Sequence, residues 1–247
     1  TADSVSSMST WGYATSIAML IVALAAPFLG VFGDIRGMRK KLFSFFMLLG
    51  VAACAGMAFT PGMDFTSGPV AAGKVASLIL VLYIVSVIGF DASAIYYDAF
   101  LTDVTTEERM DKVSTMGYGL GYIGGSTIPL LIFLIMNLVG VPMLTCLAFV
   151  FGLTAVWWLA FSLPLLKNCE QTSGKPYEKG DVARSIKGVG TTIKEIIANK
   201  PMLIYILSYF FYIDGVHTVI SMATTYGTNL GLDSTGMMLA LLLVQIL

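Results

Sequence analysis

The stretch GVFGDIRGMRKK, residues 30–41, separates two long apolar segments and decides how the rest of the chain is organised. It gathers a cluster of basic side chains around two of its glycines: Arg36, Arg39, Lys40 and Lys41. Two apolar helices joined by so short a turn must leave a membrane on the same side, and short loops rich in Lys and Arg mark the cytoplasmic side. This turn therefore predicts two membrane helices whose shared end faces the cytoplasm.

The composition supports a membrane location for the whole chain. Hydrophobic residues make up 57% of the sequence and charged residues only 12%, whereas a soluble domain carries roughly 25% charged residues. The cysteines, Cys54, Cys146 and Cys169, have no paired spacing, and the sequence has one histidine. This pattern argues against a disulfide framework and against a metal cluster. We therefore expect an all-α integral membrane protein with no metal or other cofactor.

Six apolar runs approach or exceed the length of about 20 residues that a helix needs to cross a bilayer. They are residues 11–32, 42–59, 75–101, 113–138, 144–166 and 201–223. A seventh run begins near residue 236 and stops with the sequence, so we expect this chain to be a portion of a longer protein. Within residues 167–200, apolar side chains recur at helical spacing among charged ones, which predicts an amphipathic surface helix.

The distribution of basic residues orients these runs. Alternate loops place thirteen of the fourteen Lys and Arg residues on one side and leave only Lys74 on the other. Because an excess of Lys and Arg marks cytoplasmic loops, the basic side is predicted to be cytoplasmic. The membrane is expected to be the plasma (inner) membrane if the protein is bacterial, and a vacuolar-type membrane if it is fungal.

The sequence offers no catalytic constellation. It contains no HExxH, GxSxG or GxxxxGK[ST] motif, and these motifs carry metalloprotease, acyl-transfer and nucleotide chemistry. The pair Tyr97-Asp98 resembles half of an intramembrane aspartyl protease, which needs a second membrane aspartate. Asp34 is the available partner, but it lies among four basic residues in a water-facing turn and is expected to stay ionised. We therefore expect no enzyme activity and no nucleic-acid partner.

Several ionisable residues fall inside the apolar runs, where they normally face a cavity or a partner because burying a charge there is costly. Asp91 and Asp98 lie seven residues apart on one helix face, and Asp214 and His217 lie three residues apart on another. Asp214 falls near mid-membrane, where a carboxylate beside an imidazole can pass a proton or hold a polar solute. The alternative is a hydrogen-bonded pair that only locks the bundle. Asp98, near the basic side, is expected to be structural.

Three glycines form a ridge on one helix face. Gly117, Gly121 and Gly125 recur at a spacing of four within GYGLGYIGG, and glycine at such positions lets a second helix approach to backbone contact. The ridge predicts tight helix packing. A smooth sliding surface for a conformational change is the other interpretation, and both can hold together.

Four blocks of the sequence resemble a known family. Gly30-x-x-x-Asp34-x-x-Gly37-x-Arg39-Lys40 resembles the signature loop between the second and third helices of the major facilitator superfamily. Residues 96–125 (YYDAFLTDVTTEERMDKVSTMGYGLGYIGG), 157–165 (WWLAFSLPL) and 209–227 (YFFYIDGVHTVISMATTYG) are similar to its vacuole-effluxer-like branch, which includes autophagy-related amino-acid exporters. The blocks occur in the expected order over most of the chain.

The resemblance implies a helical bundle of which this chain holds a part. The runs would be helices two to seven, plus the start of helix eight, of an expected twelve. Residues 1–166 would form the N-terminal half without its first helix, residues 167–200 a cytoplasmic linker with an amphipathic helix, and residues 201–247 the start of the C-terminal half.

The same resemblance implies a gating role for the opening motif. The residues concerned are Gly30, Asp34, Gly37, Arg39 and Asp98. In the family pattern Asp34 would cap a helix of the other half, and Arg39 would pair with an acid at the end of helix four, for which Asp98 is the expected residue. The motif departs from the superfamily pattern at Ile35 and Met38, so we expect fewer charges in the gate than relatives use.

Together these features predict a secondary active transporter that works by alternating access. It would export small polar solutes such as amino acids, coupled to protons, and its partners would be the lipid bilayer, the solute and protons. Asp91, Asp214 and His217 are the predicted residues of the transport pathway and of proton coupling. The alternative is a non-transporting membrane scaffold or receptor that retains the fold and binds a partner on residues 167–200.

Overall fold

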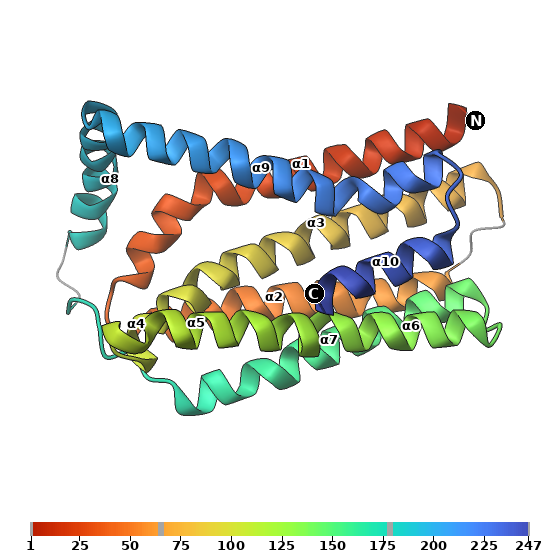
Figure 1. Ribbon diagram of the computed structural model, residues 1–247, viewed down its shortest axis with the longest axis horizontal. Helices are drawn as coiled ribbons and strands as arrows, with labels where there is room; N and C mark the ends of the chain where they lie inside the picture. Colours follow the sequence, from red (N-terminus) through yellow and green to blue (C-terminus); the bar gives the residue numbers. More distant parts are fainter. Residues whose placement is uncertain (1, 64–66, 177–179, 247) are drawn as a thin grey trace. The chain divides into compact units, whose positions relative to one another are not determined.

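The computed structural model describes residues 2–63, 67–176 and 180–246. Residues 64–66 of the predicted second loop and residues 177–179 of the predicted linker lie outside the described residues. The chain is built from helices (Figure 1). In chain order the elements are α1 (Ala2–Gly33), α2 (Arg39–Phe59), η1 (Thr60–Gly62), α3 (Pro69–Ala99), α4 (Leu101–Val104), α5 (Glu107–Gly121), η2 (Tyr122–Thr127), α6 (Ile128–Leu138), α7 (Met143–Asn168), α8 (Asp181–Ala198), α9 (Lys200–Asn229) and α10 (Ser234–Ile246).

Six helical segments within the described residues are long and apolar enough to cross a membrane. They are Ser9–Gly33, Arg39–Gly62, Pro69–Val104, Glu107–Leu138, Met143–Asn168 and Lys200–Ile220. Each contains most or all of one predicted apolar run, and several extend beyond it because the helix continues through polar residues at its ends. The predicted all-α membrane fold is confirmed.

The described residues divide into two compact units, residues 2–176 and residues 180–245. The first unit holds the helices from α1 to α7 and the ordered segment that follows α7. The second unit holds α8, α9 and nearly all of α10.

The core of the first unit lies where α2 packs against α3 and α7. Its buried apolar side chains are Phe43, Met47, Val51, Cys54, Met57, Tyr96 and Ala155. Tyr96 is fully buried, and its hydroxyl donates to the carbonyl of Leu29 in α1 over 3.0 Å. A single tyrosine on α3 therefore fixes the last turns of α1 beside the core.

Two glycines for which no role was predicted, Gly50 and Gly89, set the distance between α2 and α3. A Cβ added to Gly89 would lie 2.6 Å from both Cα and N of Gly50 and 2.8 Å from the carbonyl oxygen of Phe46. Backbone atoms cannot rotate away as a side chain can. The crossing of α2 and α3 therefore requires glycine at position 89, in the way that small residues permit close helix packing in membranes.

The predicted ridge of Gly117, Gly121 and Gly125 lies on α5 and η2. Within the described residues no atom lies within 4 Å of a Cβ added to Gly121 or Gly125, and at Gly117 only the Tyr97 hydroxyl lies that near, at 3.9 Å. Within the described part of residues 2–176, the structure therefore brings no helix into close contact with the ridge. Its role in packing or sliding stays a prediction.

The ridge is also interrupted by a π-helical turn. Pro129 has no N–H to donate, and the preceding turn, Tyr122–Thr127, is wider than an α-helix. The Thr127 hydroxyl donates to the Tyr122 carbonyl over 2.9 Å, and the Trp157 indole of α7 donates to the Gly124 carbonyl over 3.0 Å. Such π turns often occur at functional sites. Here the turn contains Gly125 and so changes the helical spacing between Gly121 and Gly125.

In the second unit, α8 lies where the amphipathic helix was predicted, and Ile186, Ile193 and Ile197 are exposed on it. The longer α9 follows directly and begins at a capped end, because the Asn199 side chain accepts from the backbone N–H of Met202 over 3.3 Å. Helix α9 carries Asp214 and His217.

Candidate functional site

The turn between α1 and α2 is short and its backbone is specified by one glycine. Helix α1 ends at Gly33 and α2 begins at Arg39. Between them Gly37 has φ +80°, a conformation that other residues rarely adopt. The amide of Asp34 donates to the carbonyl of Gly30 over 3.2 Å, which closes the last turn of α1.

A segment from far along the chain lies against this turn. We call residues 171–175, which follow the end of α7 at Asn168, the strap. The amide of Arg36 donates to the carbonyl of Lys175 over 3.0 Å, and the amide of Lys175 donates to the carbonyl of Asp34 over 3.1 Å. These two bonds form a parallel β-bridge between Ile35 and Lys175. The start of the predicted linker is therefore held by the turn between α1 and α2.

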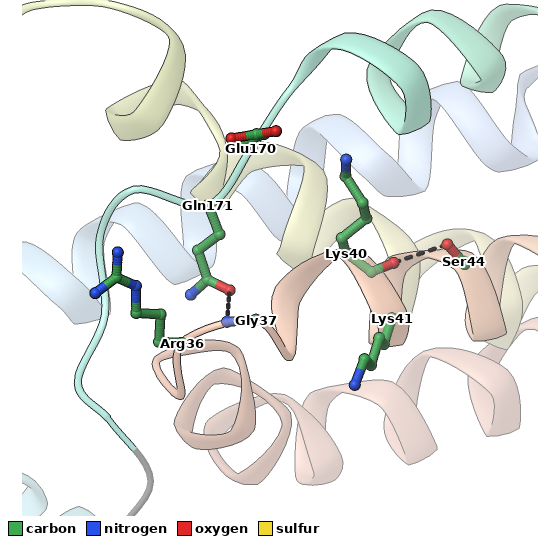
Figure 2. Close-up of a pocket in the computed structure, with 7 residues that line it drawn as sticks. All are labelled: Arg36, Gly37, Lys40, Lys41, Ser44, Glu170 and Gln171. Carbon is green, nitrogen blue, oxygen red and sulfur yellow. Dashed lines mark hydrogen bonds between the residues drawn. The ribbon is translucent and has the colours of Figure 1, made fainter.

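Gln171 makes the most contacts between the strap and the turn. Its Oε1 accepts from the amide of Gly37 over 2.8 Å (Figure 2) and from the amide of Arg39 over 3.2 Å. Its Nε2 donates to the carbonyl of Gly33 over 3.0 Å. Helix ends leave amides and carbonyls without partners inside the helix. One side chain thus bonds the last carbonyl of α1 and the first amide of α2.

A buried ion pair lies beneath the strap. Arg39 forms a salt bridge with Asp103, and the two side chains are 6% and 0% exposed. Arg39 Nη1 also donates to the carbonyl of Ala99 over 2.9 Å and to the Ser173 hydroxyl over 3.1 Å. The other carboxylate oxygen of Asp103 accepts from the amide and hydroxyl of Thr172 over 3.1 Å and 3.0 Å, and from the amide of Ser173 over 2.8 Å. The pair therefore connects α2, α4 and the strap.

The predicted pairing of Arg39 with Asp98 is wrong: the acid that contacts Arg39 is Asp103. Asp98 is exposed on the last turn of α3. The chain remains helical after α3, and Asp103 lies four and three residues beyond Ala99 and Phe100, on the helix face that Tyr96 and Phe100 bury. The sequence contains a pattern that could have predicted this partner. Asp103 follows Phe100 by three residues and Tyr96 by seven, and residues at these spacings share one helix face.

The other residues of the predicted gate, Asp34, Gly30 and Gly37, lie in or beside the turn between α1 and α2. Asp34 is exposed, and its backbone carbonyl contacts the strap. No atom of the described chain lies within 4 Å of a Cβ added to Gly30 or Gly37. The gating role of these residues, and the capping of another helix by Asp34, stay predictions.

The predicted pathway residues are divided between the units. Asp91 is half-buried on α3 in the first unit, whereas Asp214 and His217 are exposed on α9 within the second unit. Because each unit is described by itself, a joint role of these side chains in one pathway stays a prediction.

An open hollow borders the turn on the side of α2. It has a volume of ≈ 460 Å³ and is lined by Arg36, Gly37, Lys40, Lys41, Ser44, Glu170 and Gln171. Figure 2 shows Lys40 and Lys41 pointing away from each other on α2 and Arg36 on the other side of Gln171, with Glu170 in the segment that follows α7. The Gln171 side chain that bonds the turn forms part of its wall.

Replacing Gly174 with alanine is expected to detach the strap. Gly174 has φ +112°, and a Cβ there would lie 2.8 Å from the Asp34 carbonyl oxygen and 2.9 Å from Gln171 Nε2. The unfavourable backbone conformation costs about 1–2 kcal/mol, and the collision adds about 1–3 kcal/mol. Limited trypsin digestion in detergent should therefore cleave after Arg36, Lys40 or Lys41 at least about tenfold faster, since 1.4 kcal/mol is a factor of ten.

Gly140→Ala is the matched control for the strap. Gly140 has φ +82°, but a Cβ there meets nothing within 4 Å, so it introduces the backbone strain without the collision. Equal digestion of the turn in both variants would contradict the proposed contact.

The helices, the basic turn and its buried ion pair define a multi-pass helical membrane protein with an ordered polar network at its basic end. The family model described as "Vacuole effluxer Atg22 like" matches residues 2–109 and 102–247. The chain belongs to this family, and the resemblance to the vacuole-effluxer-like branch is confirmed.

Individual relatives agree with this assignment. The chain is 39% identical to the "Uncharacterized MFS-type transporter YxiO" of Bacillus subtilis (strain 168) over 241 residues, which are 95% of this chain and 54% of that protein. It is 26% identical over 131 residues to "Autophagy-related protein 22-1" of Sclerotinia sclerotiorum, which covers 47% of this chain and 22% of that protein. The chain thus spans about half the length of its bacterial relative. No solved structure matches it at a significant level.

Proposed function

We propose that this chain is part of a secondary active transporter that exports small polar solutes, such as amino acids, by alternating access. Membership of the family supports the proposal, as does the similarity to a bacterial protein named an MFS-type transporter. The observation that carries it is the polar network formed by Arg39, Asp103 and the strap.

The network has the properties that a latch for alternating access requires. Its bonds are polar and lie at one end of the bundle, so they can be broken without unpacking the apolar core around Met47 and Tyr96. The strap follows α7 in sequence and precedes the second unit, so a displacement of that unit can act on it through the chain. Arg39 Nε is also buried without a hydrogen-bond partner among the described residues, which leaves the network incompletely satisfied.

In this proposal the two halves of the transporter rock about a central solute site. Intact contacts between strap and turn would hold one state, and their release would accompany the change to the other. Asp91, Asp214 and His217 would line the pathway, and Asp214 would carry the proton because a carboxylate deep in an apolar helix can exchange one. The identity at 39% to a Bacillus protein favours the plasma membrane, with the basic loops on the cytoplasmic side.

Asp214→Asn is expected to abolish the pH-driven part of transport. Asparagine keeps the size and polarity of the side chain but cannot exchange a proton. In proteoliposomes, a pH gradient should drive amino-acid flux through the unmodified protein and leave the flux of this variant at its gradient-free level. Flux measured with and without the gradient checks the expectation.

Asp233→Asn serves as the control for that measurement. The Asp233 carboxylate accepts from the amide of Gly236 over 2.7 Å near the start of α10, and asparagine caps a helix as well as aspartate does. This variant should respond to the gradient normally. A normal gradient response in Asp214→Asn would rule out a proton role for Asp214.

The alternative, a scaffold or receptor that binds a partner on residues 167–200, needs that segment to be available. The strap is already bonded to the turn and to Asp103. Among the described residues of this segment, α8 has an exposed face with Ile186, Ile193 and Ile197 that such a partner could bind. Solute flux separates the two functions, because a scaffold transports nothing.

A further inference from the structure

The hollow beside the turn is strongly cationic. Its lining contains three basic side chains, Arg36, Lys40 and Lys41, and one carboxylate, Glu170, so it carries a net charge of +2 (3 − 1 = 2). Within the part of the chain that the structure describes, the basic residue that forms a salt bridge is Arg39, with Asp103. The three cations of the hollow thus lack a carboxylate within 4.0 Å among these residues. Their charge is available to an anion from outside the chain.

The position of the cations on α2 increases this preference. Lys40 and Lys41 lie in the first turn of α2, which contains no acidic residue. The amino end of a helix carries partial positive charge, so it disfavours cations and favours an anion. The local electrostatic field of the helix therefore adds to that of the side chains.

An exposed apolar strip continues from the hollow along α2. Phe45 and Leu48 follow Lys41 by four and seven residues, and they are 60% and 51% exposed. Residues at these spacings share one helix face. They lie within Arg39–Gly62, a segment long and apolar enough to span a membrane. A lipid with an anionic headgroup and a hydrocarbon chain would therefore find Lys41 and the apolar strip on the same face of α2, with Arg36 and Lys40 in the rest of the lining.

We propose that the hollow binds the phosphate headgroup of an anionic phospholipid, with an acyl chain along Phe45 and Leu48. Arg36, Lys40 and Lys41 line the hollow and would supply the positive charge that attracts the phosphate, and the Ser44 hydroxyl is part of the same lining. Basic pockets at the cytoplasmic ends of membrane helices bind such headgroups. The lipid would lie beside Gln171 and so beside the contact between strap and turn.

Lipid binding by the purified protein tests this site. Native mass spectrometry in detergent would compare phosphatidylglycerol with phosphatidylcholine of identical acyl chains. We expect a preference for phosphatidylglycerol. The triple variant Arg36→Gln, Lys40→Gln, Lys41→Gln should lower its affinity about a hundredfold, at about fivefold for each cation. Glu170→Gln removes the opposing carboxylate and should raise the affinity about fivefold.

The control variant removes three other exposed basic side chains of the first unit, none of which lines the hollow: Lys74→Gln, Arg109→Gln, Lys112→Gln. It should leave the affinity for phosphatidylglycerol within about twofold of the unmodified protein, since exposed charges away from a ligand are screened. Equal affinities for the two lipids, or equal losses in the two triple variants, would overturn the proposal. Displacement of phosphatidylglycerol by inorganic phosphate would also overturn it, because the hollow would then be a site for free anions. If the triple variant does not fold, an unchanged affinity in Glu170→Gln is the overturning result.

Discussion

Asp103→Ala is expected to destabilise the first unit more than any other single substitution at the basic end. The Arg39 and Asp103 side chains are 6% and 0% exposed. Removing one partner of a buried ion pair leaves the other charge buried without compensation, which costs about 3–5 kcal/mol. The substitution also removes the acceptor for the amides of Thr172 and Ser173. We therefore expect both a loss of global stability and a detached strap.

Unfolding in mixed micelles, with increasing denaturing detergent, would measure this loss. Cys54 and Cys146 are buried free thiols, so their reaction with a thiol-specific dye reports unfolding. The control is Asp111→Ala, which removes an exposed carboxylate from α5, and exposed charges contribute at most about 1 kcal/mol. Equal unfolding midpoints for the two variants would contradict a stabilising role of the buried pair.

Gly89→Ala is expected to lower stability by about 3 kcal/mol, the upper end of the usual range for overpacking. The added Cβ would lie 2.6 Å from the Cα and N atoms of Gly50. These backbone atoms can yield only if α2 and α3 move apart, and that movement would loosen the core around Met47 and Tyr96. The same dye-reaction assay checks the expectation through Cys54, which lies in this core.

Gly73→Ala provides the comparison on the same helix. A Cβ at Gly73 meets nothing within 4 Å, so this variant should keep its stability or gain up to about 1 kcal/mol from the better helix propensity of alanine. If Gly89→Ala were as stable as Gly73→Ala, the close approach of α2 and α3 would be disproved.

The helices were predictable because their signal is local. A membrane helix needs about 20 consecutive apolar residues, and such runs can be read directly from the sequence. The amphipathic α8 was predictable for the same reason, since its isoleucines recur at helical spacing. The observed helices differ from the predicted runs mainly at their ends. For example, α9 includes polar residues such as Lys200 and Asn229, which continue its hydrogen-bonding pattern.

The helix contacts were predicted less well. The ridge at Gly117 looked like a packing surface because its glycines are regularly spaced, yet the close crossing lies at Gly50 and Gly89, which are isolated in the sequence. Whether a glycine allows a close helix contact depends on which atoms of the neighbouring helix lie opposite it. The spacing of glycines within one helix does not predict those atoms.

The candidate site was predicted in part. Arg39 was assigned an acidic partner at the right end of α3, but the predicted run ended at residue 101, whereas the helical chain continues to Val104 and the partner is Asp103. The strap was hidden within a polar stretch without periodicity. Its contacts with the turn join residues more than 130 positions apart, as in the bond between Gly37 and Gln171. Only the folded chain brings these residues together.

Counterflow in proteoliposomes tests the proposed carrier function most directly. Liposomes containing the protein would be loaded with unlabelled amino acids, and the entry of labelled amino acids would then be followed without any ion gradient. A carrier with alternating access exchanges solute, so internal amino acid should accelerate the entry of label and produce a transient accumulation. Entry equal to that of protein-free liposomes would identify a scaffold, and entry unaffected by internal solute would identify a channel. Either result would contradict the account.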